Sequence, residues 1–285
     1  MKYKFLCWLA LGFSLLAVTE VYSPAPSVQE HQLTAQQIEA RKWLNDGVEA
    51  YKKSSTDEAI EDFKKAKELD PSLTNAQLYL ATAYSSQYIP GAPSPQNIRY
   101  GELALEGFQE LLEKDPNSLS AIDGAGLILY NMAGLPFSIE KMEEAKSYHQ
   151  KHIQIAPNDP EPYYWIGVID WSIAFRSNSV LRDDWTKKTS RELDPSDAMP
   201  EEIRQEFATK YGDVVQEGIQ NLTKAIALRT DYADAVAYLN LLYRQKADME
   251  RNSISRDDDL KTADDLVDQV KAIKEKEMKQ FEQNQ

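Results

Sequence analysis

Asp57–Pro71 (DEAIEDFKKAKELDP) is the stretch that decides the fold. Within it, Ala59, Phe63 and Ala66 recur at intervals of four and three residues, the spacing of one apolar face of a helix. Pro71 marks the point beyond which that helix cannot continue. The same pattern of small, aromatic and proline residues recurs further along the chain. The sequence therefore predicts a repeated unit of two helices, and chains built from such units are more often binding scaffolds than enzymes.

Five such units follow one another from Ala35 onward. Most have a small residue in the first helix, a small and a bulky residue in the second helix, and a closing proline. The residues at these positions are Trp43, Gly47, Ala59, Phe63, Ala66 and Pro71 in the first unit; Leu80, Ala81, Tyr84, Ala104, Phe108, Leu111 and Pro116 in the second; Gly126, Ala145, His149, His152 and Pro157 in the third; Tyr163, Ile166, Gly167, Gly218, Leu222, Ala225 and, in place of proline, Thr230 in the fourth; and Leu239, Tyr243, Ala263, Val267 and Val270 in the fifth.

This pattern resembles that of the tetratricopeptide repeat (TPR) family, and the chain resembles exported bacterial TPR proteins of unassigned function. The resemblance covers roughly Ala35 to Met278. It implies an all-α fold, a right-handed α-solenoid of about five helix pairs. We expect the repeat array over residues 35–256, and a capping helix and tail over residues 257–285. No single repeat can bury its apolar face alone, so the stack must fold cooperatively.

Three of the units are longer than the first. Between the small residues of their two helices, the second, third and fourth units hold 11, 7 and 39 additional residues. The largest insertion, at about residues 177–212, contains Trp185 and a helix start at Pro200, and the second unit's insertion is Tyr88–Asn97. We expect the insertions to gather along one edge of the solenoid, where they would rim a groove and shape what enters it. The alternative is that these surface loops are longer through drift alone.

The N-terminal residues have the features of a targeting signal rather than of a folded domain. Lys2 and Lys4 precede an uncharged apolar run from Phe5 to Val18, which is typical of a secretory signal and short for a membrane span. We expect a signal peptide, or an uncleaved anchor, over residues 1–23 and a linker over residues 24–34. The protein is then exported, periplasmic or secreted, and an uncleaved signal would anchor it to the inner membrane. Any membrane tether would be this segment only.

The net charge of the chain indicates which class of partner it can bind. The chain carries 46 Asp and Glu against 32 Lys and Arg, a formal charge of -14, and its basic residues form no dense patch. Such a field repels phosphate backbones, so the sequence argues against nucleic acid and in favour of a protein or peptide partner. Cys7 is the one cysteine of the chain and lies in the apolar N-terminal run.

In the TPR family, the concave groove is lined by the first helix of each pair, at positions turned away from the second helix. The resemblance carries this role onto a set of aromatic and polar residues, where rigid rings supply contact area and polar groups hold a peptide. The set is Tyr51, Asn75, Thr82, Asp123, Tyr130, Asn131, Tyr164, Trp171, Arg244 and Gln245. The family's carboxylate clamp requires several Lys or Arg side chains in the groove, and Arg244 is the obvious one here, so a clamped acidic tail is not expected.

Other chemistry is weakly indicated. His149 and His152 are spaced as two metal ligands on one helix would be, but they occupy packing positions of the repeat and have no third ligand near in sequence. We therefore expect no cofactor, no metal and no catalytic residue, and the sequence favours a binding protein over an enzyme. The predicted function is an exported protein- or peptide-binding scaffold. The alternative is a periplasmic protein that encloses a small ligand or cell-wall fragment beneath the fourth-unit insertion, near Trp171 and Trp185.

Overall fold

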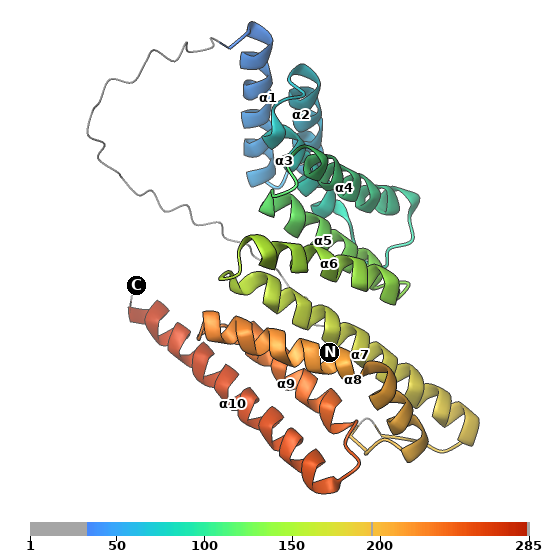
Figure 1. Cartoon of the computed structure of the whole chain (residues 1–285). Helices are drawn as coiled ribbons and strands as arrows, with labels where there is room; N and C mark the ends of the chain where they lie inside the picture. The colour runs from blue at the N-terminus through green and yellow to red at the C-terminus, as the bar shows by residue number, and fades with distance from the viewer. Residues whose placement is uncertain (1–32, 195, 284–285) are drawn as a thin grey trace.

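The computed structural model describes residues 33–194 and 196–283, and this part of the chain folds into ten α-helices arranged as successive pairs (Figure 1). The helices are α1 (Ala35–Lys52), α2 (Thr56–Leu69), α3 (Thr74–Gln87), α4 (Pro95–Lys114), α5 (Leu119–Ala133), α6 (Ile139–Ile155), α7 (Pro160–Thr189), α8 (Glu201–Leu228), α9 (Ala233–Ala247) and α10 (Ser253–Gln283). The predicted all-α solenoid of five helix pairs is confirmed.

Each helix packs against its neighbours in the chain, most extensively against the other member of its pair, and α7 also packs against α9. The pairs therefore form a stack that begins with α1 and α2 at one end and finishes with α9 and α10 at the other (Figure 1). The odd-numbered helices are the first members of the pairs. The last helix begins at Ser253, a little before the expected start, and packs on α9 as the second member of the fifth pair.

Four pairs end with the same backbone geometry. Asp70, Asp115, Ala156 and Arg229 each follow a second helix with φ between -131° and -136° and ψ between 72° and 97°. In each of them the backbone N–H donates to the carbonyl four residues earlier. Proline follows the first three, as the repeat pattern predicts, because a residue before proline is biased to extended backbone. Thr230 follows the fourth, so the stack imposes this turn without proline.

The small residues of the repeat permit close packing within a pair. A methyl group added at Gly47 of α1 would lie 2.6 Å from the ring of Phe63 on α2, and one added at Gly167 of α7 would lie 2.3 Å from Leu222 on α8. Real carbon contacts are never this short, so a larger residue would force the helices apart. Phe63 and Leu222 are buried, as the repeat pattern requires.

The long fourth-unit insertion does not form a separate segment. Helix α7 continues to Thr189 and α8 begins at Glu201, so most of the extra residues lengthen this one helix pair. Trp185 packs against the same hydrophobic cluster as Met199 and Phe207, between the extended parts of the two helices. The insertion is therefore an extension of the solenoid core with a short connection, rather than a lid or a passive loop.

Residues 1–32, which hold the expected signal or anchor and most of the expected linker, lie outside the described residues. Among the residues that the structure describes, no helix combines the length and the apolar character that a membrane span requires.

Candidate groove at Trp171 and Phe175

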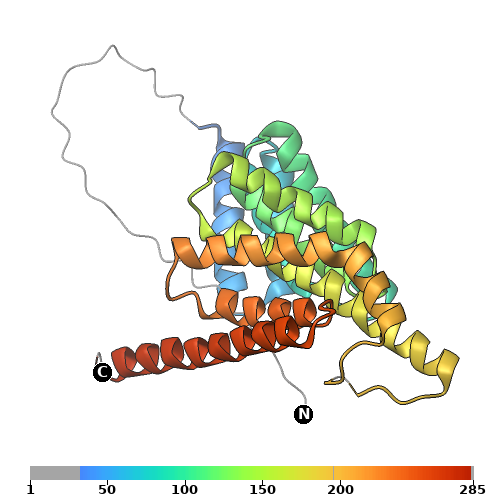
Figure 2. The same cartoon turned by 60° about the horizontal axis from the view of Figure 1, so that its bottom comes forward.

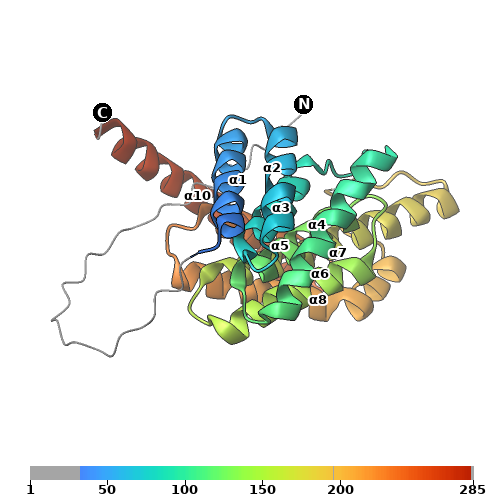
Figure 3. The same ribbon diagram turned by 90° about the horizontal axis from the view of Figure 1, so that it is seen from above.

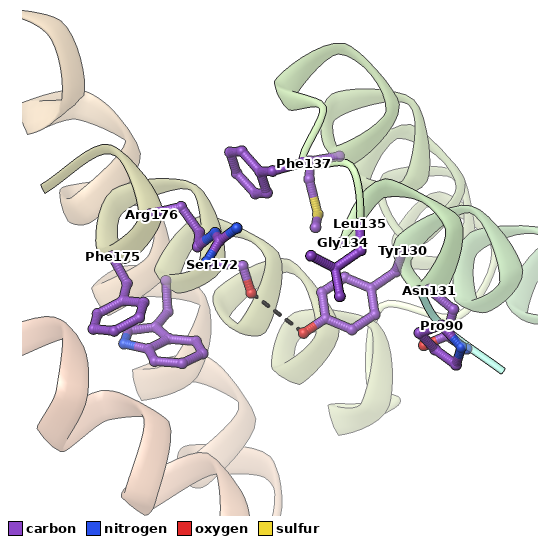
Figure 4. A pocket seen from close by; sticks show the side chains of 11 residues that line it. Pro90, Tyr130, Asn131, Gly134, Leu135, Phe137, Ser172, Phe175 and Arg176 are labelled. Carbon is purple, nitrogen blue, oxygen red and sulfur yellow. Dashed lines mark hydrogen bonds between the residues drawn. The ribbon is translucent and has the colours of Figure 1, made fainter. Parts of the chain in front are cut away.

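A mainly apolar hollow lies between α5, the α5–α6 turn and α7, and has a volume of about 350 Å³. It opens to solvent, and the side chains that line it come from three repeats (Figure 4). These residues are Pro90, Tyr130, Asn131, Gly134, Leu135, Phe137, Met142, Trp171, Ser172, Phe175 and Arg176.

Trp171 and Phe175 form the aromatic wall of this hollow. They are four residues apart on α7, so both side chains lie on one face of the helix, and their rings stack with centroids 5.2 Å apart. The ring of Tyr238 on α9 also packs against Trp171, with centroids 5.3 Å apart and the two planes 73° apart. Phe175 remains 42% exposed, whereas Phe63 and Phe207 are buried.

A second hollow, of about 320 Å³, is lined by the same two rings. Trp171 and Phe175 line both hollows, so the two adjoin, and together their linings reach from α5 across α7 to α9 and α10. We call the two adjoining hollows together the Trp171–Phe175 groove. The remaining residues of the second hollow are Ser196, Leu241, Arg244, Gln245, Asp248, Arg256 and Leu260.

A few polar groups are placed among the apolar ones in the first hollow. The hydroxyl of Tyr130 lies 3.3 Å from that of Ser172, which also donates to the carbonyl of Val168 at 2.8 Å (Figure 4). The guanidinium of Arg176 lies 5.6 Å from the ring centre of Phe137. Arg176 forms no ion pair with any described residue, so its charge is available to a ligand.

The two arginines of the second hollow already contact other residues of the protein. Arg244 pairs with Asp264 of α10 at 2.7 Å. Its neighbour Gln245 is buried and accepts a hydrogen bond of 3.0 Å from the amide of Asn178. Arg256 donates to the carbonyl of Ser196 at 3.0 Å, and its Nε is buried with no partner among the described residues. Arg244 is therefore a link between α9 and α10 as well as a groove residue.

The structure brings half of the predicted groove residues together. Tyr130, Asn131 and Trp171 line the first hollow, and Trp171, Arg244 and Gln245 line the second. The other five lie outside both hollows: Tyr51, Asn75 and Thr82 are exposed on α1 and α3, Asp123 binds Nδ1 of His152 at 2.6 Å, and Tyr164 packs its ring against Trp165, Tyr232 and Tyr238.

Phe175, Arg176 and Arg256 were not predicted from the sequence. Phe175 could have been found as the residue one helical turn after Trp171, since both face the same way. Arg256 had no such signal, because it lies on the last helix and enters the groove only through the packing of α10 on α9.

The insertions of the second, third and fourth units all contribute to the groove. Pro90 comes from the α3–α4 turn, Leu135 and Phe137 from the α5–α6 turn, and Ser196 from the α7–α8 connection. The α3–α4 turn is held in shape by Asn97, whose buried amide donates to two of its carbonyls, each at 2.9 Å. Trp185, expected beside an enclosed ligand, lines neither hollow.

The two histidines pack inside the third pair. His149 is buried with its ring 5.9 Å from and nearly parallel to that of Trp165, and His152 is hydrogen-bonded to Asp123. Within residues 33–194 and 196–283, no group of three or more His, Cys, Asp or Glu side chains is arranged to hold a metal ion.

The fold defines the class: this chain is an α-solenoid of TPR-type helix pairs, and the resemblance seen in the sequence is confirmed for the fold. No family model matches the sequence, and no curated protein is similar to it. Solved structures with a similar fold include MamA residues 41-end from Desulfovibrio magneticus RS-1 (16% identity, TM-score 0.53, 84% of this chain and 96% of that one). A second MamA structure gives 16% identity, TM-score 0.52, and coverage of 80% and 91%. YrrB, described as a TPR protein with an unusual peptide-binding site, gives 15% identity, TM-score 0.49, and coverage of 80% and 86%. At these identities the likeness concerns the fold alone.

Proposed function

We propose that this protein is an exported scaffold that binds a protein or peptide partner in the Trp171–Phe175 groove. The observation that carries the proposal is the exposed aromatic wall shared by two hollows. Burying an exposed phenylalanine stabilises a complex, and aromatic side chains in pockets are frequent anchors of protein interfaces. An open groove across several repeats suits an extended chain better than it suits an enclosed small molecule.

The chemistry of the groove indicates what the partner segment presents. The first hollow is lined mainly by apolar side chains, so it favours an apolar or aromatic anchor. Arg176, at the edge of the hollow and without an ion-pair partner among the described residues, favours a carboxylate beside that anchor. The overall charge of -14 works against acidic partners at long range, so this carboxylate is recognised at close contact rather than by steering.

The N-terminal segment supports the exported location. It has the basic start and apolar run of a secretory signal, and it precedes a solenoid body whose sequence contains no cysteine. We propose that the protein works in the periplasm or outside the cell. If the signal is not cleaved, it would anchor the protein to the inner membrane. N-terminal sequencing of the protein recovered from an envelope fraction would distinguish these outcomes.

Site-specific photocrosslinking tests the groove directly. A photoreactive phenylalanine analogue at position 175 should capture a discrete partner from the cell envelope. The matched control is the same analogue at Val180, which is 57% exposed on the same helix but lines neither hollow. Capture from position 175 and not from 180 is the expected result. Equal capture at both positions, or none at position 175 when the protein is folded and exported, would contradict the proposal.

A further inference from the structure

Helix α10 extends well beyond the helix on which it packs. The side-chain amide of Asn240 on α9 donates to the carbonyl of Ala263 on α10, and the two helices are antiparallel. This register brings the first residue of α9, Ala233, level with about Val270. The following residues, 271–283, project from the body of the solenoid, as Figures 2 and 3 show.

The face of α10 that packs on α9 continues along this projecting part, where Lys274 and Glu277 lie between its apolar residues. Ala263 is fully buried, and Phe281 lies 18 residues later, which is five helical turns, so both point the same way. Phe281 is 66% exposed and Met278, on the same side, is 63% exposed. Val270 and Ile273, its other apolar residues, are half-buried. The face that packs on α9 therefore runs on past the end of α9 without a cover among the described residues.

The projecting face is complementary to itself. We propose that a second copy of this chain packs on it, with the two α10 helices antiparallel about a two-fold axis midway between residues 275 and 276. This arrangement sets each residue opposite the one equally far from the axis on the partner. The pairs nearest the centre of the contact are Val270 with Phe281 and Lys274 with Glu277, whereas Ile273 and Met278 lie toward its edges.

Charge favours this face over others for self-association. The whole chain carries a formal charge of -14, which makes two copies repel each other. Residues 268–283, in contrast, contain four lysines and four acidic residues and are neutral. Neither Lys274 nor Glu277 forms an ion pair with another described residue, so each is free to pair across the two-fold axis. The two Val270–Phe281 pairs then bury Phe281, with Met278 at the edge of the contact, and the same surface serves both copies, as at other isologous interfaces.

A charge-swap series tests the proposal, with sedimentation equilibrium of the full chain between about 1 and 100 μM, the range expected for a small interface. Wild type should show a reversible monomer–dimer equilibrium, and Phe281→Glu should be monomeric. Lys274→Glu and Glu277→Lys should each weaken association about tenfold, because each creates two like-charge contacts per dimer. The double variant Lys274→Glu/Glu277→Lys should associate like wild type.

Ile254→Glu is the matched control. Ile254 is 68% exposed on the same helix but lies on the opposite side from the projecting face, so this variant should dimerise like wild type. All of these positions lie at the surface, so the thermal unfolding midpoints should stay close to that of wild type. A monomeric wild type, a dimer that survives Phe281→Glu, or a double swap that associates no better than its single variants would overturn the proposal.

Discussion

His149 occupies the position that Phe63 and Phe108 hold in the first two repeats. It is 1% exposed, and neither of its ring nitrogens has a hydrogen-bond partner among the described residues. Burial first, and the nearby His152 second, lower the pKa of His149 to about 3. A buried polar atom without a partner costs free energy, so this residue is a weak point of the third repeat.

The variant His149→Phe should make the protein less sensitive to acid. In the folded state His149 stays neutral until about pH 3, whereas the unfolded chain takes up the proton below about pH 6.5. Stability therefore falls as the pH falls from 6.5 toward 3, by about 2 kcal/mol at pH 5. Urea unfolding at pH 7 and pH 5 should show this loss in wild type over and above any loss in the variant. Equal losses in both proteins would show that His149 is not responsible.

At this scale the sequence predicted the groove only in part. Trp171 and Tyr130 were found because the repeat register shows which residues of a first helix face inward. Tyr164 has the same register, but other aromatic rings cover it. Which inward-facing ring stays open depends on how neighbouring pairs rotate against each other, and no spacing within one repeat encodes that rotation.

A buried charge network joins three helices in the middle of the stack. Lys146 of α6 is 2.8 Å from Asp170 of α7 and 3.1 Å from Glu217 of α8, with Glu143 also at 3.1 Å. Burial alone would lower the pKa of Lys146, but Asp170 and the two glutamates outweigh it, and the pKa lies above that of an ordinary lysine. Burial raises the pKa of Asp170, against the pull of Lys146.

Lys146→Met should destabilise the protein by about 3–5 kcal/mol, because it leaves Asp170 buried without its counter-charge. Lys146→Met combined with Asp170→Leu should recover most of this loss, since an apolar pair needs no partner. The free energies of unfolding from urea denaturation measure both effects. A double variant as unstable as Lys146→Met alone would show that the network is not held by this charge pair.

In the long fourth pair, a proline-containing motif does not mark the position at which the helix ends. Leu-Asp-Pro at residues 193–195 repeats the Leu-Asp-Pro of residues 69–71 at which α2 ends, but α7 already ends at Thr189, where Ser190 adopts a left-handed conformation with φ of 55°. The start of α8 after Pro200 was predicted correctly. Residues 177–189 are therefore part of a packed helix, and a deletion that includes them should disrupt the fourth pair.

Helix α7 is also tied to the connection that follows it. Arg182 donates to the carbonyls of Asp194 and Asp197, at 3.3 and 3.0 Å, and pairs with Asp248 of α9 at 3.0 Å. These contacts keep the connection against the second hollow, where Ser196 lies. No sequence motif predicts these contacts of Arg182, because its partners are distant in sequence and come together only when α7 packs against α9.

For the whole molecule, the period of the sequence was sufficient to predict the architecture. Small residues within each pair and the turn after each second helix repeat with the same chemistry, and the structure repeats with them. The location of the groove was not predictable in the same way. The first helices of the first two repeats supply none of the residues that line either hollow, although the family pattern assigns inward-facing positions to them as well.

The rim of the groove comes instead from features that break the repeat. The turns after α3 and α5 carry Pro90, Leu135 and Phe137 to it, whereas Trp171 of the aromatic wall occupies a regular position of the repeat. The length of each insertion could be read from the sequence, but the surface that it reaches depends on the curvature of the whole stack.

The affinities of wild type and of Phe175→Ala for the captured partner show whether that partner binds in the Trp171–Phe175 groove. Phe175 is exposed, so its loss should leave the thermal unfolding midpoint almost unchanged. As an anchor of the groove it should cost about 2 kcal/mol of binding, or about 30-fold in Kd by isothermal titration calorimetry. Val180→Ala, on another face of the same helix, should bind like wild type. An unchanged Kd for Phe175→Ala would mean that the partner does not use the Trp171–Phe175 groove.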